Sequence, residues 1–195
     1  MATYKVIEAF QSIQGEGRHM GVPATFIRLF DCNLNCTFCD TVWNDKSKIV
    51  EMTTEEIITL CDGLDLVVIT GGEPSMQNLN PLIRELQKQP HTVAVETNGY
   101  KYKNIRAANH IALSPKNYSR PEGHWDEIKL LFSISNRVKQ EEELLYWVDE
   151  RYSVCVGAIN NNDTIDKANM LTAINVAIVN DVPLNPQLHK LLGVE

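Results

Sequence analysis

Residues 65–74 read DLVVITGGEP, a run of apolar and β-branched residues that stops at two glycines, an acid and a proline. The run predicts a strand buried on both faces, because it lacks the polar alternation of a half-exposed strand. The two glycines predict a turn at the carboxyl end of the strand, where a backbone without side chains can approach a ligand closely.

Similar runs recur along the chain and predict six strands, at 24–30, 65–70, 92–97, 110–114, 126–132 and 152–159. A helix is expected from Thr53 or Thr54, where Thr53 and Glu56 form a capping-box pattern, and further helices over 80–89, 139–150 and 164–180. Pro81 stands near the start of the second helix, where its missing N–H costs nothing. Each parallel crossover needs its own helix, and a closed barrel takes eight such units and about 250 residues. We therefore expect an α/β fold, an open and partial parallel β/α barrel of about six strands.

Composition narrows the class of protein. The 195 residues are 44% hydrophobic and show no linker or repeat, so we expect one domain over 1–195. Eighteen Lys and Arg against 25 Asp and Glu give a net charge of -7, which disfavours a nucleic-acid surface. The sequence shows neither a leader-like start nor an apolar run of membrane length. We expect a soluble, cytoplasmic protein that acts on a small molecule, without nucleic acid or membrane as a partner.

Four unusual segments follow four consecutive predicted strands. They are DCNLNCTFCDT at 31–41, TGGEP at 70–74, ETNG at 96–99 and SPK at 114–116. Because the carboxyl ends of parallel strands share one edge of a sheet, these segments are expected to face a single mouth.

The first segment places Cys32, Cys36 and Cys39 at C-x3-C-x2-C spacing. Three thiols within eight residues favour metal ligation over disulfides. A closed zinc site would want a fourth ligand, and the nearest histidines, His19 and His91, are distant in sequence. Three thiolates on a four-iron cluster leave one iron open to the amine and carboxylate of an amino acid, so we favour an iron–sulfur site. The other two cysteines, Cys61 and Cys155, are expected to be small buried hydrophobes.

The cysteine spacing, with Phe38 before the third cysteine, and the TGGEP run resemble the signature of the radical S-adenosylmethionine (SAM) family. The resemblance implies that Cys32, Cys36 and Cys39 hold a 4Fe–4S cluster and that Phe38 lies by the adenine of SAM. It also implies that Gly71, Gly72 and Glu73 meet the amino group of SAM, and two glycines and a carboxylate suit that role physically. The remaining SAM-binding residues that it implies are Cys39 itself, Asp40, Glu96, Asn98, Ser114, Pro115 and Lys116.

A second resemblance rests on FQSIQGEG at 10–17, Arg28, DEIKLL at 126–131 and QLHK at 187–190, and it extends over nearly the whole chain. These segments are similar to the 7-carboxy-7-deazaguanine synthase family. The resemblance implies an N-terminal substrate-binding segment at 8–28 and a C-terminal one at 184–195. Within them, Arg28 would pair with a substrate carboxylate, for which its forked donors are suited. Further substrate contacts implied in the same way are the edge-binding residues Ile13, Gln14, Gly15 and Glu16, together with Thr70 and His189.

The same resemblance makes the hydroxyl of Thr41 a ligand of Mg2+ and lets Asp40 orient that site. A single hard oxygen from the protein is consistent with magnesium chemistry. One feature departs from the family: many members carry a Gln-Pro pair after the last core strand, where this chain reads GAINNN at 157–162. Asn160 is the candidate replacement.

The implied reaction is ring contraction of 6-carboxy-5,6,7,8-tetrahydropterin to 7-carboxy-7-deazaguanine with loss of ammonia, a carbon–nitrogen lyase step of queuosine and deazapurine biosynthesis. The cofactors would be the 4Fe–4S cluster, SAM and Mg2+; an electron donor such as flavodoxin and a homodimer are also implied. Two alternatives stay open. One is an activase that installs a glycyl radical on a partner protein, which would not need FQSIQGEG, Arg28 or QLHK. The other is a non-enzymatic iron–sulfur or zinc module, which would leave TGGEP, ETNG and SPK without a purpose.

Overall fold

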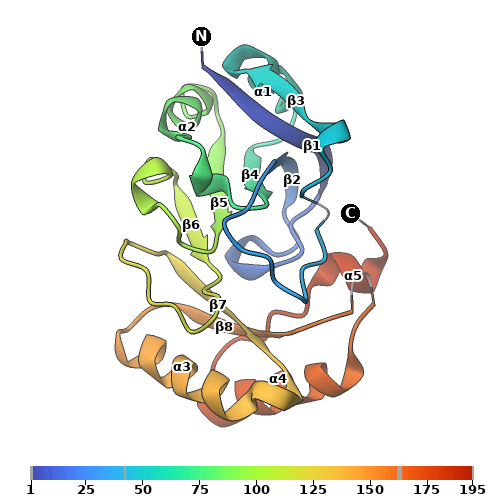
Figure 1. The fold of residues 1–195 in the computed structure, drawn as a ribbon, viewed down its shortest axis with the longest axis vertical. Coiled ribbons are helices and arrows are strands. Elements are labelled where there is room, and N and C mark those ends of the chain that lie inside the picture. The colour runs from blue at the N-terminus through green and yellow to red at the C-terminus, as the bar shows by residue number, and fades with distance from the viewer. Residues whose placement is uncertain (1, 42, 162–163, 195) are drawn as a thin grey trace.

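The computed structural model describes residues 2–41, 43–161 and 164–194, and in these residues eight strands form a single sheet (Figure 1). The strands are β1 Thr3–Ile13, β2 Pro23–Leu29, β3 Val50–Thr53, β4 Leu66–Gly71, β5 Thr92–Thr97, β6 His110–Leu113, β7 Glu127–Phe132 and β8 Val154–Ala158. The α-helices are α1 Thr54–Leu60, α2 Asn80–Leu86, α3 Arg137–Asp149, α4 Lys167–Asn180 and α5 Leu188–Leu192. Short 3-10 turns are η1 Gly17–His19, η2 Lys46–Lys48, η3 Pro74–Met76, η4 Tyr102–Asn104 and η5 Ile134–Asn136.

The strand order is β3-β1-β2-β4-β5-β6-β7-β8, with β3 and β8 at the two ends, so the barrel is open. The six strands from β2 to β8 in this order are parallel and correspond to the six expected from sequence. Pairing of β1 with both β2 and β3 is antiparallel, and these two strands were not expected. The reason is that β1, TYKVIEAFQSI, alternates polar and apolar residues, whereas the expected strands were continuous apolar runs.

Two crossovers differ from the expectation that each carries a helix. The link from β5 to β6 contains only the turn η4, and the described residues between β6 and β7 form no helix. Tyr102 and Trp125 from these two links pack edge to face, with ring centroids 5.2 Å apart, and the side chain of Ile105 is fully buried. Aromatic packing therefore covers this part of the sheet in place of helices.

The four longer helices lie close to their expected positions, and their starts have local causes. Thr53 Oγ1 accepts a hydrogen bond from the Glu56 amide, and the Glu56 carboxylate accepts one from the Thr53 amide, which confirms the capping box. The last long helix begins at Lys167 rather than Thr164, because Asp166 caps it by accepting from the amides of Ala168 and Asn169. The short helix α5 was not expected.

The two faces of the sheet have different chemistry. The outer face carries the main core, in which Ile128, Leu130 and Phe132 of β7 point toward α3 and α4, the two helices side by side in Figure 1. The inner face holds a smaller apolar cluster of Ala24, Leu66, Val68 and Ala94. Since neighbouring residues of a strand point to opposite faces, the polar residues of β7 are directed into the barrel.

The chain after α4 returns to the open side of the barrel. Leu184 makes a parallel bridge with Val156 of β8, and the amide of Asn185 donates to the Val156 carbonyl at 2.7 Å. This path carries residues 185–190 back toward the loop that joins β1 to β2. It brings two segments together that are far apart in sequence.

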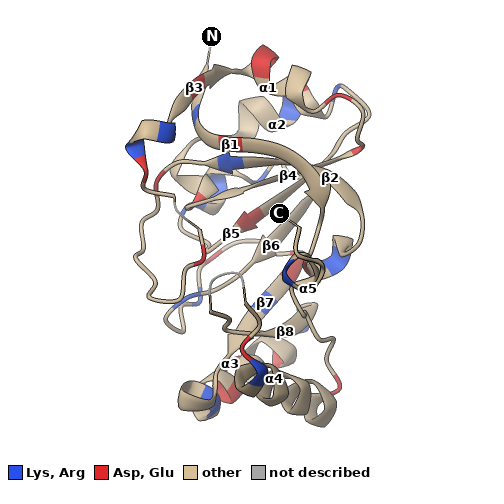
Figure 2. Cartoon of the chain, turned by 90° about the vertical axis from the view of Figure 1, so that its right-hand side faces the viewer, with Lys and Arg blue, Asp and Glu red and all other residues tan. Residues whose placement is uncertain are grey.

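Lys and Arg are spread over separate elements among Asp and Glu, as Figure 2 shows. Among the described residues, no helix combines the length and apolar character needed to cross a membrane.

Candidate active site

A cleft of about 660 Å³ opens at the carboxyl ends of the parallel strands, a volume ordinary for a small-molecule site. All four strand-end segments contribute lining residues, which confirms that they face one mouth. The expected site residues that line it are Ile13, Gln14, Gly15, Glu16, Arg28, Cys32, Cys36, Phe38, Cys39, Asp40, Thr41, Thr70, Gly71, Gly72, Glu96, Asn98, Ser114, Lys116 and His189.

The three cysteines of the loop are free thiols at the cleft. Cys32 and Cys36 are half-buried and Cys39 is exposed, and the Cys39 amide donates to the Cys36 carbonyl at 3.2 Å. Burial raises the pKa of the Cys32 and Cys36 thiols, and nearby Lys116 partly offsets this for Cys36. The other two cysteines, Cys61 and Cys155, are buried as expected.

The donor set of this loop fits an iron–sulfur cluster. Three thiols from one loop line the same cleft, and thiolates are the ligands that such clusters take. In the part of the chain that the structure describes, no group of three or more His, Cys, Asp or Glu is placed to hold a metal ion. Ligands of a four-iron cluster each bind a different iron, so they stand further apart than ligands that share one ion.

Gly71 and Gly72 place the end of β4 against the cysteine loop. A Cβ on Gly72 would lie 1.9 Å from the Asp31 carbonyl oxygen, and one on Gly71, whose φ is +135°, would lie 2.3 Å from the Leu29 carbonyl. Any larger residue would push the loop away, so these glycines are required by backbone contact within the protein.

Glu73 and Pro115 are the two expected site residues that do not line the cleft. The buried Glu73 carboxylate accepts hydrogen bonds from the Ser75 amide at 2.9 Å, the Thr97 hydroxyl at 2.6 Å and the Asn98 amide at 2.6 Å. It thereby joins the ends of β4 and β5.

Asn98 and Lys116 connect the other strand ends to the cysteine loop. The side-chain Nδ2 of Asn98 donates to Asn33 Oδ1 at 2.9 Å. Lys116 donates to the Ser114 hydroxyl at 2.5 Å, and its Nζ lies 5.8 Å from the Phe38 ring centroid. Burial lowers the pKa of Lys116.

Arg28 is held beside Thr41, because its Nη1 donates to the Thr41 hydroxyl at 3.2 Å. Its Nε forms an ion pair with Glu8 at 2.8 Å, a partner that was not expected. The guanidinium carbon also lies 5.7 Å from the Phe10 ring centroid. These contacts fix the guanidinium at the cleft wall. A small polar pocket next to it is lined by both Asp40 and Thr41.

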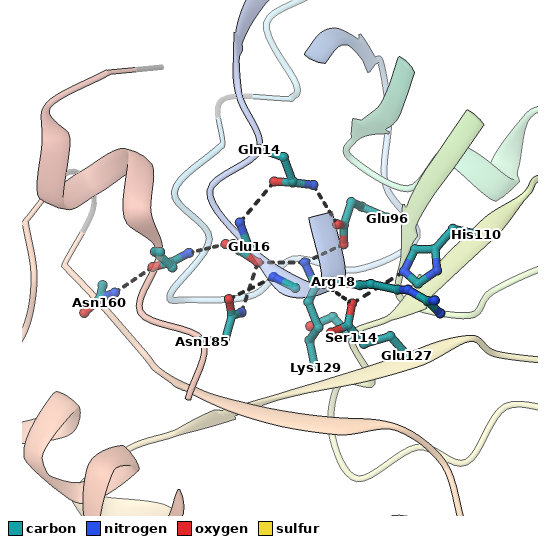
Figure 3. A network of polar contacts seen from close by, with 12 residues as sticks. Gln14, Glu16, Arg18, Glu96, His110, Ser114, Glu127, Lys129, Asn160 and Asn185 are labelled. Atoms are coloured by element: carbon teal, nitrogen blue, oxygen red, sulfur yellow. Dashed lines mark hydrogen bonds and ion pairs between the residues drawn. The ribbon is translucent and has the colours of Figure 1, made fainter. Parts of the chain in front are cut away.

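The opposite wall is a polar network built from segments distant in sequence (Figure 3). Lys129 of β7 lies between two carboxylates, 2.7 Å from Glu16 and 2.5 Å from Glu96. Gln14 donates to Glu96 at 3.2 Å, and Gln187 donates to Glu16 at 2.6 Å. Gln187 also accepts a 2.6 Å hydrogen bond from Asn160, the candidate replacement for the family pair, which lines the cleft.

The segments 8–28 and 184–195 meet at Gly15. A Cβ on Gly15 would lie 2.0 Å from His189 Nδ1, and the Leu188 amide donates to the Gly15 carbonyl at 2.8 Å. Burial lowers the pKa of His189. Lys190 forms an ion pair with Asp40 at 2.5 Å, which ties α5 to the cysteine loop.

Lys129 and Gln187 are cleft residues to which sequence reasoning gave no role. For Lys129 a signal existed, because β7 reads EIKLLF and a lysine on the inner side of a buried strand requires an acidic partner. Gln187 begins the QLHK segment quoted above, but its position in the cleft depends on the path of the chain after α4.

Comparison with known proteins gives consistent results. The radical SAM superfamily matches residues 27–145. The 7-carboxy-7-deazaguanine synthase of Rickettsia prowazekii is 33% identical over 98% of this chain and 88% of its own length. The enzyme of the same name from Prochlorococcus marinus is 34% identical over 72% of this chain and 67% of its own length. The crystal structure of QueE from Escherichia coli superposes with a TM-score of 0.79 at 27% identity, covering 96% of this chain and 95% of that one.

Proposed function

Because the chain belongs to the 7-carboxy-7-deazaguanine synthase family of radical SAM enzymes, we propose that the cleft residues described above carry out the reaction of that family. The enzyme performs a radical SAM ring contraction in deazapurine biosynthesis. Its substrate is 6-carboxy-5,6,7,8-tetrahydropterin, and its products are 7-carboxy-7-deazaguanine and ammonia. The observation that carries the assignment of residues is the cleft itself, which joins the cysteine loop to the Glu16 and Arg28 walls.

Family membership implies a 4Fe–4S cluster and SAM as cofactors. Cys32, Cys36 and Cys39 would hold the cluster, and Gly72, Asn98 and Ser114 would lie along SAM. When bound, this pair of cofactors supplies the carbon-centred radical that takes a hydrogen atom from the substrate.

The protein's own residues bind and orient the pterin. Glu16 accepts hydrogen bonds from its guanidine-like edge, while the Arg28 guanidinium pairs with its carboxylate. Gln14 and Gly15 contact the same edge of the pterin, and His189 covers it. Two fixed anchors at opposite ends of a small rigid ligand leave one hydrogen atom facing the cofactor side, which favours a single abstraction site.

Mg2+ is the third cofactor that we assign, with Thr41 as its protein ligand. The support is that the Thr41 hydroxyl faces the same polar pocket as Arg28, which is the group that would hold the substrate carboxylate. A hard cation with one protein oxygen and several water or substrate oxygens is ordinary for magnesium.

We also assign a flavodoxin-type electron donor, a cytoplasmic location and a homodimer. The dimer is supported by the outer side of α4, where Leu171, Ile178 and Val179 are exposed by 62%, 73% and 77%. Sedimentation at micromolar concentration would test it, and a species of one chain mass would reject it.

An anaerobic assay of the reconstituted protein tests the function. With SAM, Mg2+, a reductant and 6-carboxytetrahydropterin, mass spectrometry should detect 7-carboxy-7-deazaguanine together with 5'-deoxyadenosine. Deoxyadenosine without deazaguanine would keep the radical SAM class and reject the substrate, as an activase would require. Neither product from a protein with an intact cluster would support a non-enzymatic module instead.

A further inference from the structure

Lys129 is a buried cation shared by two acids. Its side chain is 6% exposed, and its ammonium contacts Glu16 at 2.7 Å and Glu96 at 2.5 Å. An unpaired charge at such a position is strongly destabilising, so the lysine and the acids depend on one another. Glu96 stands at the end of β5 and Glu16 in the loop after β1, so the lysine joins two walls of the cleft (Figure 3).

The Glu16 carboxylate is fixed by donors on both oxygens. Lys129 contacts Oε2 and Gln187 donates to Oε1 at 2.6 Å, while Asn185 lies 3.5 Å from Oε2. A carboxylate has about four acceptor positions, so these donors orient it without exhausting it. Acceptor positions remain for a ligand in the cleft that Glu16 lines.

The shared lysine affects the two acids differently. Burial by itself would raise the pKa of Glu16, but Lys129, Gln187 and His189 outweigh burial and lower it to about 2. Burial raises the pKa of Glu96; Lys129 only partly opposes this, and the charge of Glu16 adds to it. Burial would lower the pKa of Lys129, but the two carboxylates raise it, so the lysine stays charged.

We propose that Lys129 is a positioning residue that keeps Glu16 ionised and oriented into the cleft, so that the site selects a ligand edge with adjacent N–H donors. The proposal rests on the proposed function, in which that edge is the guanidine-like side of the pterin. Charged acceptors bind such donors about twice as strongly as neutral ones, which makes the charge state of Glu16 a determinant of specificity.

Several other groups face Glu16 and would influence its titration. His189 of α5 acts in the same direction as Lys129, whereas Glu96 of β5 opposes it. More distant charged or ionisable groups around it are Lys116, Glu127 and Cys155. Among the residues that the structure describes, only Lys129 and Gln187 contact the carboxylate at 2.7 Å or less, so the lysine is the group to change.

The variant Lys129→Met removes the charge and keeps the length of the side chain. In the cofactor-free protein, the carboxyl 13C signal of Glu16, assigned by its loss in Glu16→Gln, should titrate at a much higher pH than in the unchanged protein. Two buried carboxylates without a cation cannot both ionise easily, so one pKa rises strongly. Lys88→Met, which removes an exposed lysine paired with Glu85 at 2.7 Å, is the matched control and should leave the Glu16 signal unmoved.

A second variant provides the test if Lys129→Met alone does not fold. Lys129→Met combined with Glu96→Gln removes one charge of each sign, and Glu16 should then titrate between the unchanged protein and Lys129→Met, because burial remains but repulsion is gone. If neither variant folds, Lys129 is a folding residue and the inference is wrong.

Steady-state kinetics provide an independent test of the proposal. In Lys129→Met the KM for the pterin should rise about tenfold per pH unit below the new pKa, since binding then requires loss of a proton, while kcat and the KM for SAM change little. In the unchanged enzyme, the KM for the pterin should not show this dependence on pH. Superimposable KM profiles, or a Glu16 signal that still titrates near pH 2 in Lys129→Met, would overturn the inference. If the unchanged enzyme formed no deazaguanine, the proposed substrate would be rejected. The 13C titration would still test whether Lys129 keeps Glu16 ionised.

Discussion

The two halves of the cleft are assembled in different ways. The proposed cofactor half consists of short contiguous segments, the cysteine loop and the strand ends after β4, β5 and β6, each of which is a motif in its own right. The proposed substrate half consists of single residues from distant elements, with Lys129 joined to Glu16 across 113 positions and Gln187 joined to Glu16 across 171. Contiguous loops can hold a cofactor through backbone geometry, whereas the polar wall exists only when the whole chain has folded.

Loss of a cluster ligand should have the largest effect and should remove both halves of the chemistry. Cys36→Ala is expected to abolish both 5'-deoxyadenosine and deazaguanine and to reduce the iron content of the reconstituted protein, because three thiolates are needed for the cluster. Cys61→Ala, which changes a buried thiol at the end of α1, is the control and should retain both products. Cluster absorbance equal to that of the unchanged protein in Cys36→Ala would contradict the assignment.

Loss of Arg28 should impair binding of the pterin without abolishing cleavage of SAM. Arg28→Ala is expected to raise the KM for the pterin about a hundredfold, because a charge-assisted pair with a carboxylate contributes about 1.5–3 kcal/mol. Slow cleavage of SAM to 5'-deoxyadenosine should persist, since the cysteine loop is untouched. Glu8→Gln, which keeps the guanidinium and removes its ion pair at 2.8 Å, should have a much smaller effect. Equal loss of SAM cleavage and deazaguanine in Arg28→Ala would show that the halves are not separable.

A change at Gln187 should weaken the substrate half more gently. Gln187→Ala removes the 2.6 Å donor to Glu16 and leaves the buried Asn160 amide without its acceptor. An unsatisfied buried group costs about 1–3 kcal/mol, so we expect about a tenfold higher pterin KM together with a lower melting temperature. Gln11→Ala, which loses only an exposed 3.4 Å contact with the Asp62 carbonyl, is the control. An unchanged pterin KM would remove Gln187 from the substrate wall.

The smallest effect concerns Glu143, a half-buried acid on α3. Burial raises the pKa of Glu143 on α3 to about 7, and the charges of Lys116 and Arg120 only partly oppose this. The folded state therefore holds the Glu143 proton more tightly than the unfolded state, whose pKa is near 4.5, and stability is lost as the pH rises from about 4.5 through 7. The melting temperature of Glu143→Gln should therefore be higher than that of the unchanged protein at pH 8.5 but not at pH 5. The activity of the variant should be retained. Glu142→Gln is the exposed control, and a pH-independent difference would refute the assignment.

The sequence predicted the parts of the molecule that depend on local pattern. The six parallel strands, the capping box at Thr53 and the meeting of four strand-end segments at one mouth were all confirmed. The antiparallel strands β1 and β3 were missed because alternation in β1 does not resemble the continuous apolar runs of the other strands. The hydrogen bonds of Glu73 could not be predicted for another reason: their donors Thr97 and Asn98 are supplied by the next strand.

The polar wall could be predicted only in part. Glu16 and Arg28 were expected as substrate contacts through a family resemblance. No residue spacing predicts that Lys129 lies between Glu16 and Glu96. Such a contact is decided by the curvature of the sheet and by the route of residues 183–190 along β8. Both are properties of the assembled fold.

The segment that runs along β8 has a consequence for synthesis of the protein on the ribosome. Residues 185–190, which supply Gln187 and His189 to the cleft, are translated after every strand of the sheet. Because domains begin to form while the chain is still emerging, the cysteine loop and the strand ends can assemble before these residues arrive. The nascent enzyme would therefore be able to take up its cofactors before it can recognise its substrate.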